Sequence, residues 1–494
     1  MKFKAYSQSL LRRAQKLYNL ANKEKYIPEE AKRMVIKNSG GKIEEKYLKK
    51  HPKSRELYEK AKTLFARGVT HDSRYFEPMP IYCVRAKGSR KWDVDGNEYI
   101  DYWMGHGALI LGHAHPVVTR AATEQARKGT HLGASHELEI KWAEKVTSLI
   151  PCARGGLVEF TSSGTEATMM AIRIARAYTG KKKIIKFLSH FHGWLDYTII
   201  DYNPDYSPLL SDGYPTGIPP EICRYTIALP PNDIEAVEKS LEKDDVACVI
   251  LEPGGASMGL IPSSKEFLEK LRKITRDKGV LLIFDEVVTG FRDTPGGAQE
   301  HYGVIPDMAT LGKILGGGYP GGAVTGRREY MSLLEFKIEG KKNFRRIRHP
   351  GTFNANPLSA AAGNACLGLI LEGKVHPSIN RKGEMLKRGL SDVIEDNDVN
   401  ALVWGTTPSI IYIGFGMDQE DIEVFDIESY VRFREKMNES RKITRILEKA
   451  LINRGIHPMG PRLILSIAHT KRDIEATIEK FDEALKEMKS EGHI

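Results

Sequence analysis

Short apolar runs alternate with helical patterns from about residue 120 onward. The runs have the length of single strands, and the stretches between them repeat their apolar residues at helical spacing. Continuous apolar strands separated by helices predict a mainly parallel sheet covered by helices on both faces, which is an α/β fold. The runs are Val158–Thr161, Ile184–Phe187, Ala247–Leu251, Leu281–Phe284 and Ala309–Leu311.

Other patterns flank this region. The pair Asp95-Gly96 between apolar neighbours predicts a hairpin over residues 92–97. A helical stretch precedes it from Arg55 to Phe65, and a charged helix is predicted from Arg472 to Lys489. We therefore expect four units: a basic helical extension (1–55), the N-terminal segment of a small domain (56–120), a large domain (121–370) and a C-terminal α+β domain (371–494).

The N-terminal extension carries the net charge of the chain. Residues 1–64 hold 14 lysines and four arginines against seven glutamates, so the rest of the chain is near neutral. Residues 1–23 contain no acidic residue and predict a basic amphipathic helix, with a break at residues 38–41. Three interpretations stay open: a helix packed on the rest of the chain or on a dimer partner, a surface-binding arm, and a transit peptide. Because the charge lies on an appendage, we do not expect a nucleic-acid partner.

The composition indicates a globular protein of two or three domains among its 494 residues. No run approaches the ~18 apolar residues of a membrane span, so no membrane partner is expected. The five scattered cysteines include no CxxC pair, which favours a reducing, cytoplasmic location and neither disulfides nor a metal site. Five glutamines beside many Lys and Glu residues suggest a thermophilic source. The cysteines are Cys83, Cys152, Cys223, Cys248 and Cys366.

Two carboxylates end the most apolar run. Val280 to Phe284 is followed directly by Asp285 and Glu286. The carboxyl ends of strands are where open α/β sheets bind ligands. A carboxylate buried there needs a cationic partner. That partner could be an arginine, or the residue could cap a helix, but a protonated pyridine nitrogen would serve equally well.

A lysine lies after another predicted strand. Lys313 is flanked by Leu311 and Ile314 and is followed by the glycines at 316–318. An apolar setting lowers the pKa of an amine and makes it nucleophilic, as an imine-forming lysine must be. The glycines would allow a flat ligand close to the backbone. The lysine precedes its glycines, so the segment is not a nucleotide-binding loop, although an ordinary surface lysine remains the alternative.

Two hydroxyl-rich segments could bind a phosphate. The turn Ser162 to Glu166 opens a predicted helix, whose free N–H groups and dipole attract anions, although a plain N-cap would look the same. The loop Gly351 to Pro357 offers Thr352, or is only a turn. Together with Lys313 and Asp285, these segments supply what pyridoxal 5'-phosphate requires from a protein.

From about residue 65 to its end, the chain resembles the class III aminotransferases of fold type I and, within them, the glutamate-1-semialdehyde aminomutases and their aminotransferase relatives. The matching segments are specific in combination. They are residues 92–102 (WDVDGNEYIDY), 111–116 (LGHAHP), 163–167 (SGTEA), 284–292 (FDEVVTGFR) and 310–313 (TLGK).

The resemblance implies a seven-stranded, mainly parallel sheet in the large domain, which would bind pyridoxal phosphate. It implies that Lys313 forms the imine and moves the substrate proton, while Asp285 keeps the pyridine nitrogen protonated. Val287 and Phe191 would pack on opposite faces of the ring. Thr352 would reach the phosphate from the neighbouring subunit, which requires a homodimer. The implied cofactor-binding set is Ser163, Gly164, Thr165, Phe191, His192, Glu252, Asp285, Val287, Lys313 and Thr352.

The sequence departs from the aminomutase pattern at several positions. Phe191 replaces a tyrosine, Leu188 and Pro461 replace glutamates, and residues 201–220 replace a Ser-Gly-rich lid. Arg74 aligns with the arginine that binds the substrate carboxylate in the mutase. Arg462 is a second candidate for a bidentate carboxylate contact, with a structural ion pair as its alternative role.

These observations predict a ping-pong aminotransferase. An amino acid or amine, with β- and ω-amino acids among the candidates, would give its amino group to the cofactor, and an oxo-acid would accept it. Two alternatives remain open, a glutamate-1-semialdehyde 2,1-aminomutase and an amino-acid racemase that uses the same lysine.

Overall fold

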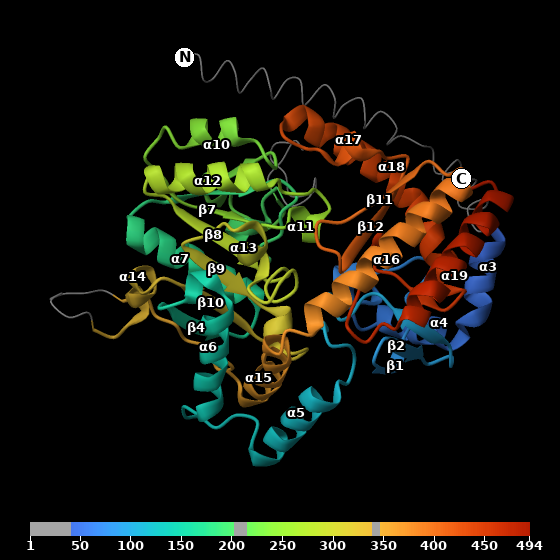
Figure 1. Cartoon of the computed structure of the whole chain (residues 1–494), viewed down its shortest axis with the longest axis horizontal. Coiled ribbons are helices and arrows are strands. Elements are labelled where there is room, and N and C mark those ends of the chain that lie inside the picture. The colour runs from blue at the N-terminus through green and yellow to red at the C-terminus, as the bar shows by residue number, and fades with distance from the viewer. Residues whose placement is uncertain (1–40, 202–214, 338–345) are drawn as a thin grey trace.

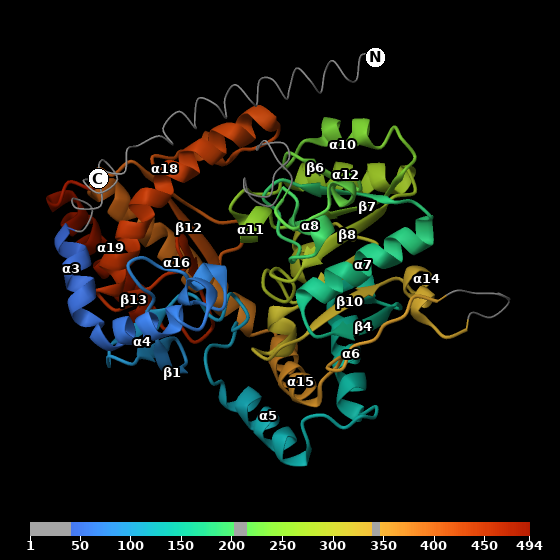
Figure 2. The same cartoon turned by 180° about the vertical axis from the view of Figure 1, so that it is seen from behind.

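The computed structural model describes residues 41–201, 215–337 and 346–494. The helix predicted over residues 1–23, the break at 38–41 except its last residue, and most of the segment 201–220 lie outside these ranges. The described chain builds three sheets (Figures 1 and 2). The largest has seven strands, which confirms the α/β fold of the sequence analysis.

The seven-stranded sheet has the order β4-β10-β9-β8-β7-β5-β6. Only β10 runs antiparallel to its neighbours β4 and β9 in this sheet, so it is mainly parallel. All five predicted runs are strands of it. The strand bounds are β4 Leu157–Thr161, β5 Lys183–Phe187, β6 Thr226–Leu229, β7 Val246–Leu251, β8 Leu281–Glu286, β9 Met308–Leu311 and β10 Gly322–Gly326.

Both faces of this sheet are buried, and the alternation of side chains along β8 shows why. Leu281 and Ile283 pack with helix α7 (Gly164–Thr179) on one face. Leu282 and Phe284 pack with helix α12 (Lys265–Asp277) on the other. Because successive strand residues point to opposite faces, a strand between two helical layers must be apolar throughout. Helix α10 (Ile234–Ser240) extends the second layer (Figure 1).

The N-terminal segment forms a four-stranded sheet with a C-terminal strand. Its order is β1-β2-β3-β13, and β2 pairs antiparallel with β3 across the predicted turn at Asp95-Gly96. The bounds are β1 Cys83–Lys87, β2 Arg90–Asp93, β3 Glu98–Asp101 and β13 Ile456–His457. Helices α3 (Gly41–Lys50) and α4 (Pro52–Lys62) lie beside it, and α4 ends three residues before the predicted Phe65.

The C-terminal part forms a third sheet covered by long helices. Strands β11 (Ala401–Trp404), β12 (Ile410–Phe415) and β14 (Arg462–Ile464) pair antiparallel in that order. Helices α16 (Val375–Asp396) and α18 (Ile427–Ile452) pack against these strands. The predicted charged final helix is α19, Lys471–Ser490.

The remaining elements connect these sheets. They are α5 Pro116–Lys128, α6 Glu137–Leu149, α8 Asp196–Ile199, α9 Pro220–Cys223, α11 Ala256–Gly259, α13 Gly297–Tyr302, α14 Arg328–Met331, α15 Pro357–Leu371, α17 Gln419–Ile422 and the 3-10 turns η2 Ala66–Gly68, η3 Asp72–Arg74, η4 Pro151–Ala153, η6 Lys313–Gly316 and η7 Ser332–Leu334. The predicted boundaries at 55/56 and 120/121 fall inside α4 and α5, and the division into domains stays a prediction.

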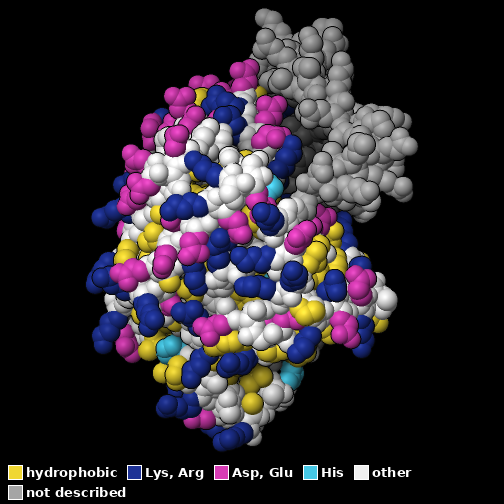
Figure 3. All heavy atoms as spheres, turned by 90° about the vertical axis from the view of Figure 1, so that its right-hand side faces the viewer, with side chains coloured by type: hydrophobic (Ala, Val, Ile, Leu, Met, Phe, Trp, Pro, Cys, Tyr) yellow, Lys and Arg dark blue, Asp and Glu magenta, His cyan; other side chains and the backbone are white. Residues whose placement is uncertain are grey.

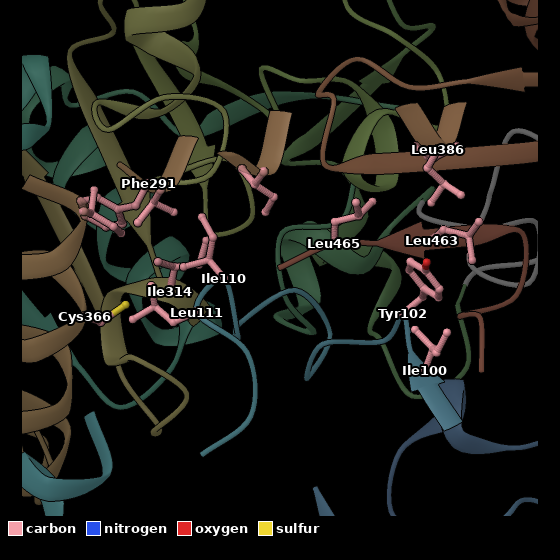
Figure 4. Packing of buried hydrophobic residues seen from close by; sticks show 14 of the residues in the cluster. Ile100, Tyr102, Ile110, Leu111, Phe291, Ile314, Cys366, Leu386, Leu463 and Leu465 are labelled. Atoms are coloured by element: carbon pink, nitrogen blue, oxygen red, sulfur yellow. The ribbon is translucent and has the colours of Figure 1, made fainter. Parts of the chain in front are cut away.

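One apolar core joins the large sheet to the C-terminal part. Ile314, next to Lys313, belongs to the same buried cluster as Ile110, Tyr102 and Leu463 (Figure 4). In Figure 4, Ile314 lies beside Ile110 and Leu111. The turn that carries Lys313 therefore belongs to a core that extends to Leu463 in the C-terminal part. On the face in Figure 3, acidic and basic side chains are interspersed. Within the described ranges, no helix is both long and apolar enough to cross a membrane.

Candidate active site

Strand β8 ends in a buried carboxylate. Asp285 is 4% exposed, and its Oδ1 accepts hydrogen bonds from Thr310 Oγ1 (3.0 Å) and from the Val287 backbone N–H (3.1 Å). Its Oδ2 lies 2.7 Å from His192 Nδ1, which donates because a carboxylate only accepts. The buried Asp285 therefore pairs with a histidine, rather than with the arginine considered as an alternative.

His192 supports Asp285 from behind. Its ring is fully buried, which lowers the pKa of the imidazole, while the Asp285 charge opposes that shift. Its Nε2 is buried without a hydrogen-bond partner within the described ranges. Because Nδ1 carries the hydrogen toward Asp285, a neutral ring keeps the carboxylate negative and available to a cationic ligand group.

Lys313 lies beyond the neighbouring strand. Asp285 pairs in register with Thr310 of β9, so Lys313 follows three residues after the partner of Asp285. Its backbone has a φ of 47°, which is rare for a residue with a side chain and is held by the fully buried Leu311 and Ile314 on either side. Burial lowers the pKa of the Lys313 amine, whereas the charges of Asp285 and Glu252 raise it. The deprotonated, nucleophilic amine is therefore more accessible than for a surface lysine.

Two of the glycines after Lys313 serve the packing of the turn, and the expectation that these glycines admit a flat ligand stays a prediction. A Cβ at Gly317 would lie 2.7 Å from the backbone oxygen of Ala362 in α15. A Cβ at Gly318 would lie 2.6 Å from Leu109 Cδ2. Both glycines have positive φ angles, 60° and 96°. They allow the chain to turn sharply against the helix and leave Lys313 at the edge of the sheet.

Helix α7 begins at the same edge. Its N-cap is Ser163, whose Oγ accepts from the Glu166 backbone N–H (3.3 Å), which leaves the hydroxyl hydrogen to donate elsewhere. A Cβ at Gly193 would come 2.5 Å from Thr165 Oγ1, so the chain after His192 passes directly over the helix start. The start of this 16-residue helix can bind an anion through its first N–H groups and its dipole.

Two apolar side chains border the space between these groups. Val287 stands between two glycines, because a Cβ at Gly164 would approach it to 2.8 Å and one at Gly312 to 3.2 Å. Phe191 is 41% exposed, and its backbone N–H donates to Glu252 Oε1 (2.8 Å). Glu252 is buried and also accepts from the Met258 backbone N–H (3.1 Å), so it fixes the segment that carries Phe191.

Two arginines were predicted as carboxylate ligands. Arg74 is exposed in η3, and its Nη1 donates to Thr70 Oγ1 (3.0 Å). Arg462 begins β14, with its guanidinium carbon 6.0 Å from the centre of the Tyr412 ring. The charge of each lowers the pKa of His106, and Arg462 also lowers the pKa of Lys313. The two arginines therefore act on the same region as Lys313.

This set of groups fits pyridoxal phosphate. A buried amine of lowered pKa, a carboxylate kept charged at the edge of the sheet and a helix N-terminus match its aldehyde, its pyridine nitrogen and its phosphate. The family model for class III aminotransferases matches residues 72–485. The chain belongs to the class III aminotransferases.

Similar proteins of known name agree with this assignment. The chain is 40% identical to a glutamate-1-semialdehyde 2,1-aminomutase from Persephonella marina, over 89% of this chain and 100% of the relative. It is 39% identical to the enzyme of that name from Methanothermobacter thermautotrophicus, over 89% and 100%. An ω-transaminase from Sphaerobacter thermophilus shares the structure with a TM-score of 0.79 and 33% identity, over 88% and 98% of the two chains.

A more distant solved structure shows the fold alone. A glutamate-1-semialdehyde aminomutase from Pseudomonas aeruginosa has a TM-score of 0.78 at 23% identity, over 92% of this chain and 98% of that one. The family match and the solved transaminases that are at least 30% identical establish that this class III aminotransferase is an enzyme of fold type I and that its cofactor is pyridoxal phosphate.

Thr352 lies on an exposed loop of this class III aminotransferase. Its backbone oxygen accepts from His131 Nε2 (2.7 Å), and the next residue, Phe353, is 57% exposed. The loop ends at Asn356, which caps helix α15. The role of Thr352 at a phosphate of another subunit stays a prediction.

Several residues that organise the site were not singled out from the sequence. The Thr310 hydroxyl donates a hydrogen bond to Asp285. His190 Nδ1 accepts a hydrogen bond from the Glu252 backbone N–H (3.0 Å). Arg292 is fully buried and donates to the backbone oxygens of Gly107 (2.7 Å) and Leu465 (3.3 Å). Thr310 and Arg292 lie inside the quoted motifs, but their partners are distant in sequence and could not be read from it.

Proposed function

We propose that this enzyme is an aminotransferase that moves an amino group from an amino acid or amine to an oxo-acid, with β- and ω-amino acids among the donors. The observation that carries the proposal is the place of Arg74 next to Ser73, whose Oγ lies 2.9 Å from His106 Nε2. The pKa of His106 is lowered first by burial and then by charges that include Arg74, Lys313 and Arg462. Two guanidinium groups near a reactive amine favour substrates that carry a carboxylate.

The residues of the chain have separate tasks in this reaction. Bound pyridoxal phosphate supplies an electron sink for the carbon that exchanges its proton. Lys313 would hold the cofactor through Nζ and, when freed from it, would carry that proton on the same atom. Asp285, oriented by His192 and Thr310, keeps a proton on the pyridine nitrogen. The N-terminus of α7 binds the phosphate and fixes the register of the ring.

Three positions favour transfer between two substrates over an internal rearrangement. Phe191 has no hydroxyl group. Leu188 is fully buried in an apolar cluster. Pro461 directly precedes β14 of the third sheet, and its backbone oxygen accepts a hydrogen bond from the Ile413 N–H (2.9 Å). None of these side chains can provide the acidic or phenolic group of the aminomutase pattern.

A glutamate-1-semialdehyde 2,1-aminomutase is the second candidate. It is favoured by the names of the relatives that are about 40% identical over nearly the whole chain. The two functions differ in one respect that can be measured, because a mutase needs no second substrate.

The test is a panel of amino donors added to the holoenzyme without an acceptor. Transfer converts the bound cofactor to its amino form, which changes its absorbance and releases one oxo-product per site. We expect β- or ω-amino acids to produce this change and glutamate-1-semialdehyde alone to give no catalytic turnover. Turnover of the semialdehyde alone would establish the mutase instead, and inversion of an amino acid without oxo-acid release would establish a racemase.

We also propose a homodimer in which Thr352 of one subunit completes the site of the other. The exposed Thr352 and Phe353 support this arrangement. Mixed dimers of Lys313→Ala and Thr352→Ala subunits test it. If Thr352 acts across the interface, half of the sites in a mixed dimer carry both defects and half carry none, so mixing restores activity. If it acts within its own subunit, mixing restores nothing.

A further inference from the structure

Two turns meet beside the proposed substrate carboxylate site through a serine between two histidines. Ser73 Oγ lies 2.9 Å from His71 Nδ1 and 2.9 Å from His106 Nε2. The two imidazole rings are 4.9 Å apart between centroids. Arg74 is the next residue in the same 3-10 turn, so this cluster adjoins the predicted carboxylate ligand.

The direction of these hydrogen bonds follows from one backbone contact. The Ser73 backbone N–H donates to His71 Nδ1 (3.1 Å), so this nitrogen carries no hydrogen. The Ser73 hydroxyl must then also donate to His71 Nδ1, because two lone pairs would otherwise face each other at 2.9 Å. The same oxygen accepts from His106 Nε2. The order is therefore His106 to Ser73 to His71, and the hydrogen of a neutral His71 resides on Nε2.

The surroundings keep both rings neutral. Burial lowers the pKa of His71, and the charges of Arg74 and Lys313 add to the shift, while Asp72 opposes it. Burial also lowers the pKa of His106, to about 4, helped by His71, Arg74, Lys313 and Arg462. A proton on His71 Nδ1 would remove the acceptor of two hydrogen bonds, so the arrangement exists only with His71 neutral.

The cluster connects an exposed turn to an anchored one. Within the exposed turn, the Arg74 backbone N–H donates to the His71 oxygen (2.9 Å). On the other side, Gly107, the neighbour of His106, accepts a hydrogen bond from the fully buried Arg292 (2.7 Å). His106 also meets the Trp103 ring edge-on at 5.0 Å between centroids. Movement of the Arg74 turn is thereby restrained by the core.

We propose that His71, Ser73 and His106 form a positioning relay that holds the Arg74 turn for a substrate carboxylate and so selects amino acids over amines without a carboxylate. The relay contributes a second donor, His71 Nε2–H, on the same turn as the guanidinium. The inference deepens the proposed function, on which it rests for the assignment of Arg74 to a carboxylate.

The first test measures binding without turnover. Propanoate and propanamide, neither of which has an amine that reacts with the cofactor, are titrated into the holoenzyme, and the dissociation constant of each is followed by calorimetry. Ser73→Ala removes both relay bonds but keeps the backbone contact, and we expect it to weaken propanoate binding about three- to tenfold, the value of one neutral hydrogen bond. Binding of propanamide, which has no carboxylate, should stay within about twofold. Equal propanoate binding by both proteins overturns the relay.

A conservative pair of variants separates positioning from general loss of structure. His71→Asn keeps an acceptor for the Ser73 N–H, because an Asn side chain forms the same short turn, whereas His71→Ala does not. We expect His71→Asn to keep propanoate affinity within about threefold and His71→Ala to resemble Ser73→Ala. Equal loss in both variants contradicts the role assigned to Nδ1.

Nitrogen NMR of the histidine rings tests the relay even if the protein transfers no amino group. The relay requires His71 to carry its hydrogen on Nε2 and His106 to carry one on Nε2, with signals assigned by the single-histidine variants. Ser73→Ala should alter both rings. The opposite tautomer at His71, or charged rings at neutral pH, overturns the proposal independently of the donor panel.

Discussion

The floor and the rim of the site are built differently. The floor consists of Asp285, Lys313, His192 and Thr310, which lie at the edge of the central sheet with buried partners. The rim consists of the turn 71–74, Phe191 and Arg462, of which Arg74 and Phe191 are exposed.

This difference separates chemistry from specificity. The floor is fixed by the same apolar packing that forms the sheet, so its geometry comes with the fold. The rim depends on a few hydrogen bonds between turns. Members of one family can therefore keep the floor and change substrate by altering the rim. Damage to the floor should lower kcat, whereas damage to the rim should raise KM.

The largest effect is expected at Asp285. Asp285→Asn keeps the shape and can still accept from Thr310 and Val287, but it loses the charge that holds the pyridine proton. Loss of one partner of a buried charged pair costs about 3–5 kcal/mol, so kcat should fall by roughly two to four orders of magnitude. The control Thr310→Val removes one hydrogen bond (3.0 Å) and keeps the charge, and its loss should stay below about tenfold. Similar losses in both variants would contradict the account.

The next effect is expected at the rim arginines. Arg74→Lys replaces a bidentate carboxylate contact with a single point charge, so the KM of a carboxylate donor should rise about 10- to 100-fold with little change in kcat. Arg462→Lys measures the second candidate in the same way. Arg328→Lys, in an exposed ion pair with Glu335 at 3.0 Å, is the matched control and should change nothing. A fall in kcat for Arg74→Lys at unchanged KM would place this arginine in the floor.

Lowering the pH should raise the KM of a carboxylate donor through the rim histidines His71 and His106. Burial lowers the pKa values of His71 and His106 below the ordinary 6.5, so both rings are neutral at about pH 7; His106 becomes protonated as the pH falls toward its pKa of about 4, and His71 also gains its proton only at acidic pH. KM for a carboxylate donor should therefore be constant above about pH 6.5 and rise severalfold below it. His71→Asn removes one titrating ring and should flatten the rise. A KM that rises toward alkaline pH instead would have the wrong sign.

The smallest effect is expected at Phe191. Phe191→Tyr adds a hydroxyl to a half-exposed ring, so kcat for the preferred donor should change less than about threefold. Phe191→Ala removes the ring and should weaken cofactor binding by about tenfold, as expected for one aromatic contact. Steady-state kinetics measures the change in kcat, and loss of the cofactor during dialysis measures the change in cofactor binding. A gain of semialdehyde turnover in Phe191→Tyr would show that this position separates mutase from transferase.

The sequence predicted the floor better than the rim because the floor is local in the chain. Asp285 lies at the end of β8, just before Glu286, and Lys313 follows the end of β9 at Leu311. The continuous apolar runs that form these strands are visible in the residues alone. Strands β6 and β10 escaped prediction. Strand β6 has only four residues, and β10 is bounded by Gly322 and Gly326, which carry no apolar signal.

Contacts between distant segments could not be predicted. His192 meets Asp285 across 93 positions, and Ser73 meets His106 across 33. The register that sets Thr310 beside Asp285 depends on how two strands pair, and their spacing does not reveal it. The close approach of Gly317 to Ala362 could not be predicted either, because Ala362 belongs to a helix that begins only at Pro357.

The covalent attachment of pyridoxal phosphate at Lys313 is the most direct test of the account. Borohydride reduction of the holoenzyme, followed by peptide mapping by mass spectrometry, locates the lysine that carries the cofactor. The account predicts one labelled peptide per chain, containing Lys313, and no such label in Lys313→Ala. A label on another lysine, or full turnover by Lys313→Ala, would contradict it.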